Sequence, residues 1–348
     1  MSSFASRIVR WQRAHGRQDL PWQAGVVGRR DPYRVWLSEI MLQQTQVSTV
    51  VPYFERFVSR FPDLPSLAAA NENDVLALWS GLGYYSRARH LHATARAVVA
   101  DYGGRFPDDV ERLARLPGIG RSTAAAIAAL AFGRRAAILD GNVKRVLARH
   151  AGVSGWPGER SVEAALWLLA EARLPSRDIE AYTQGMMDLG ALVCTRARPA
   201  CASCPVAADC VARGEGRVGE LPAARPKKVL PERHVQMLLL LDRGELMLEK
   251  RPARGVWGGL WSLPELEPGA DPVLHCRERL GVAPTAHSRL PRLSHGFTHF
   301  RLHIEPVRVE LAPGRASRPG QIWLPPADAL DAALPAPVRK LVARLVAD

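Results

Sequence analysis

Four of the chain's five cysteines lie within seventeen residues, in the arrangement Cys194-x6-Cys201-x2-Cys204-x5-Cys210. Thiols this close in the chain can all reach one small inorganic group, so the run indicates a [4Fe–4S] cluster or a zinc ion. The pair Cys201-x2-Cys204 is a common zinc half-site, but a second spaced pair is missing. The spacing therefore favours the cluster and leaves zinc open. Disulfides fit poorly, because the thiols are clustered and Cys276 would remain unpaired.

Two carboxyl groups also occupy positions with chemical potential. Glu39 interrupts the apolar stretch Val35–Leu42, where its side chain must either reach solvent or be buried with a raised pKa. A buried, protonated glutamate can act as a general acid near neutral pH. Asp140 precedes a helix expected over 142–150, and it either caps that helix or stands at the mouth of a cleft. The residues alone leave both interpretations of Asp140 open.

A glycine-containing turn, Leu116–Thr123, separates two helical stretches. Gly118 and Gly120 allow a tight turn that leaves backbone amides uncovered, and the next helix is expected to begin at about Arg121. This arrangement can bind a phosphate without reading base sequence. It resembles a helix-hairpin-helix DNA anchor over about 109–132, and an ordinary helical hairpin is the alternative.

A second turn, Gly81–Arg89, combines glycines with two tyrosines and two arginines. Stacking rings beside guanidinium groups are typical of segments that wedge into nucleic acid, which makes Tyr84 and Arg87 candidate DNA contacts. The alternative is a capping turn whose tyrosines belong to the core.

The elements that must position these residues change in kind along the chain. Residues 1–212 show helical periodicity with Pro and Gly between short helices, and strand-like alternation is absent there. This pattern predicts an all-α domain over 1–213. The segment 214–231 is rich in Gly, Pro, Arg and Lys and is expected to be an exposed linker.

The remainder, 232–348, is expected to form a smaller α+β domain. Strands are predicted over 234–241 and 246–250 around a turn at 242–244, and another over 300–309. Helical spacing follows over 338–346.

The net charge and the apolar stretches of the chain indicate what kind of partner and compartment to expect. The 348 residues carry a formal net charge of +13, which favours a polyanionic partner. The N-terminus lacks the apolar core of a secretory signal, and the longest apolar stretches, 124–132 and 237–241, are too short to span a bilayer. We therefore expect a soluble protein of a reducing compartment.

With these motifs assembled, the chain resembles the MutY-type adenine DNA glycosylases of the helix-hairpin-helix superfamily, which are related to endonuclease III. The resemblance spans nearly the whole chain. The motifs that carry it occur in family order and are Leu37–Gln46, Gly81–Arg89, Leu116–Thr123, Ile138–Arg149 and the four-cysteine run.

The resemblance implies that the four cysteines hold a [4Fe–4S] cluster and that adenine opposite 8-oxoguanine is flipped from the duplex and excised. It assigns to Glu39 the protonation of adenine, to Asp140 the stabilisation of the sugar cation, and to Asn142 the orientation of the site. The side chains and turns expected to contact DNA are Gln44, Tyr84, Arg87, Gly118, Gly120, Ser122, Arg196 and Arg198.

Ser122 occupies the position at which endonuclease III-like lyases carry a lysine. An amine nucleophile is needed to open the sugar by β-elimination, so a hydroxyl group here predicts a monofunctional glycosylase. Lys144 is near enough to Asp140 in sequence to allow adventitious imine formation.

The second domain resembles the MutT-like (Nudix) domain of the same family, most clearly in Gly255–Glu265. Working Nudix hydrolases carry a metal-binding Glu-Glu pair, which Arg277–Gly281 lacks. The resemblance implies a lesion-reading role through Phe297, Thr298 and His299, where Thr298 replaces the usual serine. If the resemblance is set aside, these residues are better interpreted as the edge of a strand.

Three alternatives remain at this stage. They are an endonuclease III-like glycosylase/lyase for oxidised pyrimidines, a non-catalytic module that binds damaged DNA, and a Nudix nucleotide hydrolase tethered to DNA. The favoured interpretation is a monomeric bacterial enzyme in the cytoplasm that associates with the nucleoid and acts on double-stranded DNA containing adenine opposite 8-oxoguanine.

Overall fold

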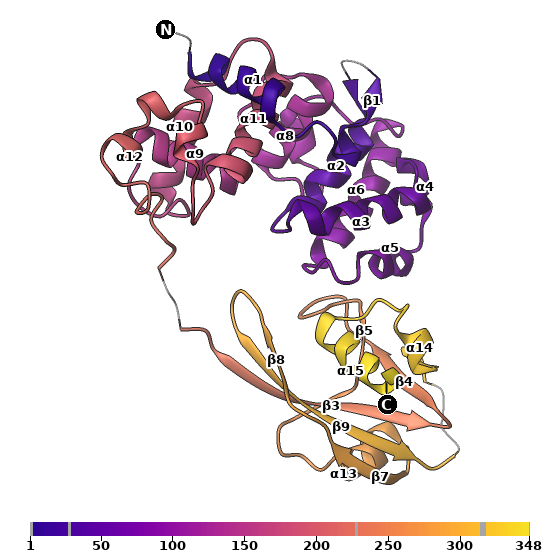
Figure 1. Cartoon of the computed structure of the whole chain (residues 1–348). Coiled ribbons are helices and arrows are strands. Elements are labelled where there is room, and N and C mark those ends of the chain that lie inside the picture. The colour runs from indigo at the N-terminus through magenta and orange to yellow at the C-terminus, as the bar shows by residue number, and fades with distance from the viewer. Residues whose placement is uncertain (1–2, 27–28, 227–228, 314–317, 348) are drawn as a thin grey trace. The chain divides into compact units, whose positions relative to one another are not determined.

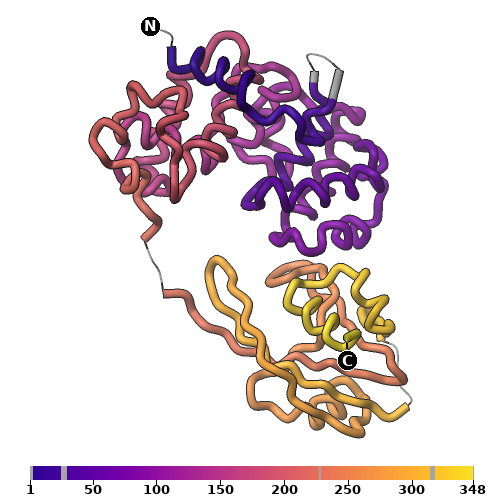
Figure 2. Tube along the Cα trace, viewed as in Figure 1, coloured from indigo at the N-terminus to yellow at the C-terminus, as the bar shows by residue number. Residues whose placement is uncertain are grey.

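The computed structural model describes residues 3–26, 29–226, 229–313 and 318–347. The chain divides into two compact units, whose bounds are Met1–Ala69 with His90–Lys227, and Ala70–Arg89 with Lys228–Asp348. Figure 1 shows the helices and strands of the chain, and Figure 2 its Cα trace. Every helix in the described ranges is too short or too polar to cross a membrane.

The N-terminal part of the chain is helical, as expected. Its α-helices are α1 (Phe4–His15), α2 (Pro32–Leu42), α3 (Val47–Arg60), α4 (Leu64–Ala69), α5 (Glu72–Trp79), α6 (Ser86–Tyr102), α7 (Val110–Ala114), α8 (Arg121–Phe132), α9 (Gly141–Ala151), α10 (Arg160–Ala172), α11 (Ile179–Asp188) and α12 (Val211–Gly214). The shorter helical turns are η1 (Pro21–Gln23), η2 (Leu189–Val193), η3 (Cys201–Ser203) and η4 (Ala207–Asp209).

This helical part also contains one short pair of strands. Strands β1 (Gly25–Val26) and β2 (Arg29–Arg30) pair in antiparallel fashion. Strands of two residues are too short to leave an alternating pattern in the sequence.

Helix α8 is the centre of the first unit. All residues from Ala124 to Ala131 are buried, and six of these eight are alanines. Such small side chains allow neighbouring helices to approach closely, and α2, α7 and α11 pack against α8. Helix α8 therefore connects α2, which carries Glu39, with the segment that leads to Asp140.

The second unit contains a mixed sheet with the strand order β10-β4-β3-β9-β7. Its strands are β3 (Glu232–Asp242), β4 (Glu245–Lys250), β5 (Trp261–Ser262), β6 (Glu265–Leu266), β7 (Pro284–Arg289), β8 (Leu293–Gly296), β9 (Arg301–Leu311) and β10 (Gln321–Leu324). Its helical elements after β6 are α13 (Pro272–His275), η5 (Cys276–Leu280), α14 (Pro326–Ala329) and α15 (Ala336–Ala347).

The sheet is covered on both faces. Met237, Leu239 and Leu241 of β3 join one core with α15, whereas Leu238 and Leu240 join a second core with the region of α13 and η5. Burial on both faces explains why this strand reads as a continuous apolar run. The predicted strands, turn and terminal helix of this domain are confirmed, with each boundary within two residues of its predicted position.

The segment expected to be an exposed linker from residue 214 is partly packed. Leu221 is buried and its carbonyl oxygen accepts a hydrogen bond from Arg149 Nε at 2.7 Å, and Ala223 N donates to Gly155 O. Positions 227 and 228 of the predicted linker lie outside the described residues. The domain boundary at 213 stays a prediction.

Candidate active site

Helix α2 places Glu39 at the wall of a pocket. The helix begins with Pro32 after Asp31, whose carboxylate accepts a hydrogen bond from Tyr33 N at 2.9 Å. Every residue from Val35 to Met41 is buried except Glu39, which is partly exposed. The apolar helix thus holds one carboxyl group at the edge of the core.

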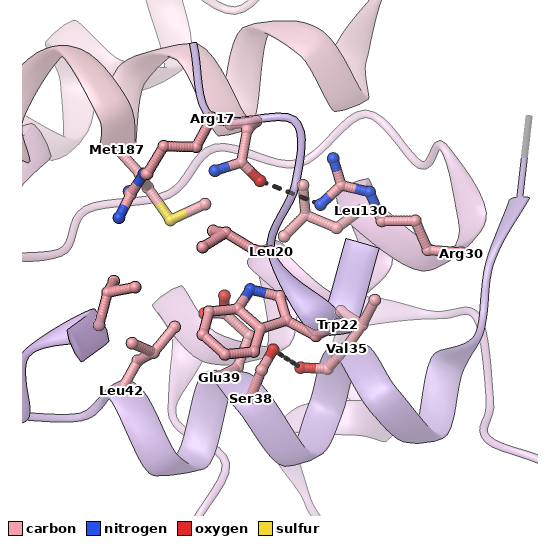
Figure 3. A pocket seen from close by; sticks show the side chains of 12 residues that line it. Arg17, Leu20, Trp22, Arg30, Val35, Ser38, Glu39, Leu42, Leu130 and Met187 are labelled. Atoms are coloured by element: carbon pink, nitrogen blue, oxygen red, sulfur yellow. Dashed lines mark hydrogen bonds between the residues drawn. The ribbon is translucent and has the colours of Figure 1, made fainter. Parts of the chain in front are cut away.

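The pocket is lined mainly by apolar and aromatic groups (Figure 3). Its lining residues are Arg17, Leu20, Trp22, Arg30, Val35, Ser38, Glu39, Leu42, Val47, Leu130, Gln184 and Met187. They come from α2, α3, α8, α11, β2 and the segment around η1. An indole and aliphatic side chains beside one carboxyl group suit a flat, largely apolar ligand with a basic nitrogen.

Two arginines complete the polar side of this pocket. Arg17 pairs with the buried Asp188, with Arg17 Nε 2.7 Å from Asp188 Oδ1. Arg30 donates to Glu180 Oε1 at 2.7 Å and to Gln184 Oε1 at 3.0 Å. Because α11 supplies the acceptors, both guanidinium groups are fixed beside the pocket. No pattern in the sequence had pointed to Arg17 or Arg30 as site residues.

Glu39 is held in a state suited to proton donation. The pKa of its carboxyl group is raised to about 7. Burial is the largest cause, the negative charge of Asp140 contributes to the rise, and Arg30 opposes it. Asp140 is thus close enough to influence Glu39 although a hundred residues separate them in sequence.

Asp140 is the N-cap of α9, and its Oδ1 accepts a hydrogen bond from Val143 N at 2.7 Å. Burial raises the pKa of Asp140, while backbone hydrogen bonds from Val143 and Asn142 lower it. The two interpretations of Asp140 are therefore compatible: one oxygen caps the helix while the carboxylate influences the pocket.

The hydroxyl group of Ser122 positions this segment. Its Oγ accepts a hydrogen bond from Leu139 N at 2.9 Å, one residue before Asp140. The Ser122 side chain thus connects the start of α8 to the Asp140 segment.

Asn142 is connected to the cysteine loop through Arg145. Arg145 Nη2 donates to Asn142 Oδ1 at 2.8 Å and to Gly190 O at 2.7 Å, and Arg145 Nε donates to Cys194 O at 2.7 Å. Gly190 lies directly against Asn142, because a Cβ atom there would stand 2.5 Å from Asn142 Cβ. Lys144 turns to Glu163, with Nζ 2.6 Å from Oε1.

The four cysteines of the run line one pocket together with Arg149 and apolar side chains. Arg149 is buried and donates to Cys194 Sγ at 3.4 Å, Thr195 O at 2.7 Å and Arg196 O at 3.1 Å. Convergent thiols beside a fixed cation fit an anionic thiolate-bound cluster or ion. The contacts of Arg145 and Arg149 with the cysteine loop were not predicted from the sequence. The helical spacing of the two arginines indicates only that they share a face of α9 with Asn142.

The predicted phosphate contacts differ in exposure. The side chains of Arg196 and Arg198 are exposed on the cysteine loop. Gly118 has φ +74°, and a Cβ atom there would lie 2.7 Å from His90 Cβ, so this turn requires glycine. Gly120 is the N-cap of α8. Gln44, at φ +59°, is exposed in a strained conformation often found at functional sites.

Tyr84 and Arg87 behave differently from each other. Tyr84 has φ +49° and is 48% exposed. Arg87 is only 8% exposed, and its Nη2 donates to the carbonyl oxygens of Leu82 and Gly83 at 3.1 Å. The buried Arg87 guanidinium therefore supports the turn from within, and the phosphate contact expected of it stays a prediction.

The loop between β8 and β9 combines an aromatic anchor with polar groups. The ring of Phe297 is partly buried, stacks on Phe300 at 4.3 Å between centroids, and lies 5.5 Å from Trp257. Thr298 and His299 are exposed at the tip.

Two family models match the chain. The HhH-GPD superfamily of base excision DNA repair proteins matches residues 37–172, and the NUDIX domain matches residues 236–344. The fold and the pocket that contains Glu39 thus belong to a base excision repair protein of this superfamily that carries a NUDIX domain.

Full-length relatives narrow the class. The adenine DNA glycosylase of Buchnera aphidicola subsp. Schizaphis graminum is 36% identical and covers 97% of each chain. The human adenine DNA glycosylase is 33% identical over 93% of this chain and 70% of its own. The chain therefore belongs to the adenine DNA glycosylase family, which confirms the resemblance drawn from its motifs.

A solved structure agrees with the helical part. A thermostable thymine-DNA glycosylase matches with a TM-score of 0.53 and 31% identity, over 61% of this chain and 95% of that one. The similarity supports the fold of the helical part.

Proposed function

We propose that this chain removes adenine opposite 8-oxoguanine, or opposite guanine, from double-stranded DNA by hydrolysing the N-glycosyl bond, and that it leaves the strand intact. One observation carries the proposal. Glu39 lines an apolar pocket, its pKa is near 7, and the carboxylate of Asp140 is close enough to influence it.

The chemistry needs a proton on the leaving base and an anion near the sugar, because the glycosidic bond breaks through an oxocarbenium-like state. Near pH 7 a substantial fraction of Glu39 is protonated and can donate to the adenine ring. Trp22 and Leu42 offer apolar surface to the flipped base. The Asp140 carboxylate stabilises the sugar cation until water attacks.

Strand cleavage is not expected, because Ser122 offers a hydroxyl group that is already bonded to Leu139 N. Lys144, the nearest amine in sequence, is paired with Glu163. An unpaired amine is needed to form an imine with the sugar.

The proposal includes a [4Fe–4S] cluster held by Cys194, Cys201, Cys204 and Cys210. When bound, the cluster would cross-link the loop that carries Arg196 and Arg198. The hydrogen bonds of Arg145 and Arg149 would then transmit the rigidity of the loop to α9. Action as a monomer in the bacterial cytoplasm, at the nucleoid, belongs to the same proposal.

A base-release assay tests the function. Duplexes carry adenine opposite 8-oxoguanine, adenine opposite guanine, or thymine glycol, and products are resolved with and without hot alkali. We expect adenine release from the first two and strand breaks only after alkali. Activity confined to thymine glycol, or strong nicking without alkali, would overturn the proposal.

A further inference from the structure

Two histidines and a glutamate converge on one face of the sheet in the second unit, at the start of β3. Glu232, His234 and His303 each offer a ligand atom, and these atoms lie within 4.8 Å of one another. The β-sheet places them together. Glu232 and His234 are two residues apart on β3 and share a face, and His303 of β9 is the direct partner of His234 in the parallel pair.

This face is the one opposite the α15 core. Val235, Leu302 and Ile304, which alternate with the three residues, pack into that core. Figure 1 shows β3 and β9 side by side with β8 next to β9. Because paired strands fix the backbone, the three side chains are held together before any ligand binds.

His303 has the surroundings of a metal-binding histidine. Its Nδ1 lies 2.9 Å from Ser294 Oγ on β8, and in the tautomer in which Nδ1 donates to that hydroxyl group Nε2 has a free lone pair. Nε2 is shielded from solvent and forms no hydrogen bond within the described residues, and Glu232 Oε2 stands 3.6 Å away. The ring of His234 stacks on that of His303 at 4.8 Å.

We propose that Glu232, His234 and His303 bind a zinc-type divalent cation. Two imidazoles and one carboxylate form a ligand set typical of zinc with a fourth position open to water, whereas magnesium and calcium prefer oxygen ligands alone. Arg301 Nη1 competes for Glu232 Oε1 from 3.8 Å, but an exposed pair at that distance is weak. The ion would join β3 to β9 next to Pro231, whose carbonyl accepts from Arg301 N.

The test is calorimetric titration of the full chain with zinc chloride, in parallel with His234→Ala, His303→Ala and Glu232→Gln variants. His287→Ala is the matched control, because His287 is exposed on β7 of the same sheet. The cysteine thiols also bind zinc, but all variants retain them, so differences between variants report the proposed site.

We expect each histidine variant to lose one zinc equivalent or to bind it at least tenfold more weakly, and Glu232→Gln to weaken it severalfold. The control should match the wild type, and millimolar magnesium should not compete. X-ray absorption at the zinc edge should show additional nitrogen and oxygen ligands in the wild type relative to His303→Ala. Equal zinc stoichiometry and affinity in all five proteins would overturn the proposal.

Discussion

Glu39 lies on helix α2 and Asp140 is the N-cap of α9, and the two carboxyl groups have different surroundings. Glu39 is surrounded by apolar groups, and burial is the main cause of its raised pKa. Burial also raises the pKa of the partly exposed Asp140, but hydrogen bonds from the backbone N–H groups of Val143 and Asn142 oppose that rise. Burial favours a neutral acid, whereas hydrogen bonds favour an anion. The comparison explains how two carboxyl groups at one site can take opposite roles.

Replacing Glu39 by glutamine should have the largest effect, because it removes the proton donor and keeps the shape. We expect adenine release in single-turnover assays to fall by about 10²- to 10⁴-fold, with duplex binding retained. Glu55→Gln, at an exposed position of α3, is the control and should be unaffected. Full adenine release by the Glu39 variant would show that Glu39 is not the proton donor.

The same variant should gain stability in alkaline solution. The pKa of Glu39 rises from 4.5 in the unfolded chain to about 7 in the folded one, so stability falls as pH rises through that window. Glutamine does not ionise, so the variant does not lose stability in this way as the pH rises. Denaturant unfolding at pH 8 should show Glu39→Gln more stable than the wild type by about 1–3 kcal/mol, with no such gain at pH 4.5.

Asp140→Asn separates capping from chemistry. Asparagine caps a helix about as well as aspartate and removes a carboxyl group whose pKa burial raises, so the variant should be at least as stable as the wild type near pH 7. The rate should nevertheless fall by about 10²- to 10³-fold, because an uncharged amide cannot stabilise a sugar cation. Asp140→Ala should be about 1 kcal/mol less stable than the asparagine variant, because alanine cannot cap the helix. A rate close to that of the wild type in the asparagine variant would leave Asp140 as a cap alone.

These two residues show what the sequence can and cannot reveal. An apolar helix interrupted by Glu39, and Asp140 placed before a helical repeat, are local patterns, and the structure has both. The contacts of Arg145 and Arg149 reach residues 45 and more positions away. Helical spacing could indicate only that both arginines lie on one face. The inward turn of Arg87 was equally hidden, because burial of a guanidinium depends on the fold around it.

Gly190→Ala tests whether α9 must lie against η2. The added Cβ would overlap Asn142, and overpacking of this kind costs about 1–3 kcal/mol. We expect a lower melting temperature and a roughly tenfold slower rate, since Asn142 follows Asp140 closely in α9. Gly219→Ala, in open space, serves as control. Unchanged rate and stability would show that the contact is dispensable.

Arg30→Gln should move the pH profile without abolishing activity. Arg30 lowers the pKa of Glu39, so its removal should raise that pKa. Glu39 then stays protonated to higher pH. The alkaline limb of the profile of single-turnover rate against pH should therefore move to higher pH. Arg34→Gln, on the helix that carries Glu39, is the control. A limb that stays in place or moves to lower pH would show that Glu39 does not control the profile.

Arg198→Ala should have the smallest effect and should spare both carboxyl groups. The exposed guanidinium can neutralise one phosphate, so its loss should weaken binding severalfold and reduce the slope of log affinity against log salt by about one. The effect should be equal for duplexes with 8-oxoguanine, with guanine and without a lesion, and the bound rate should not change. A loss confined to the 8-oxoguanine duplex would make the cysteine loop a reader of the lesion, because a phosphate contact carries no information about the base.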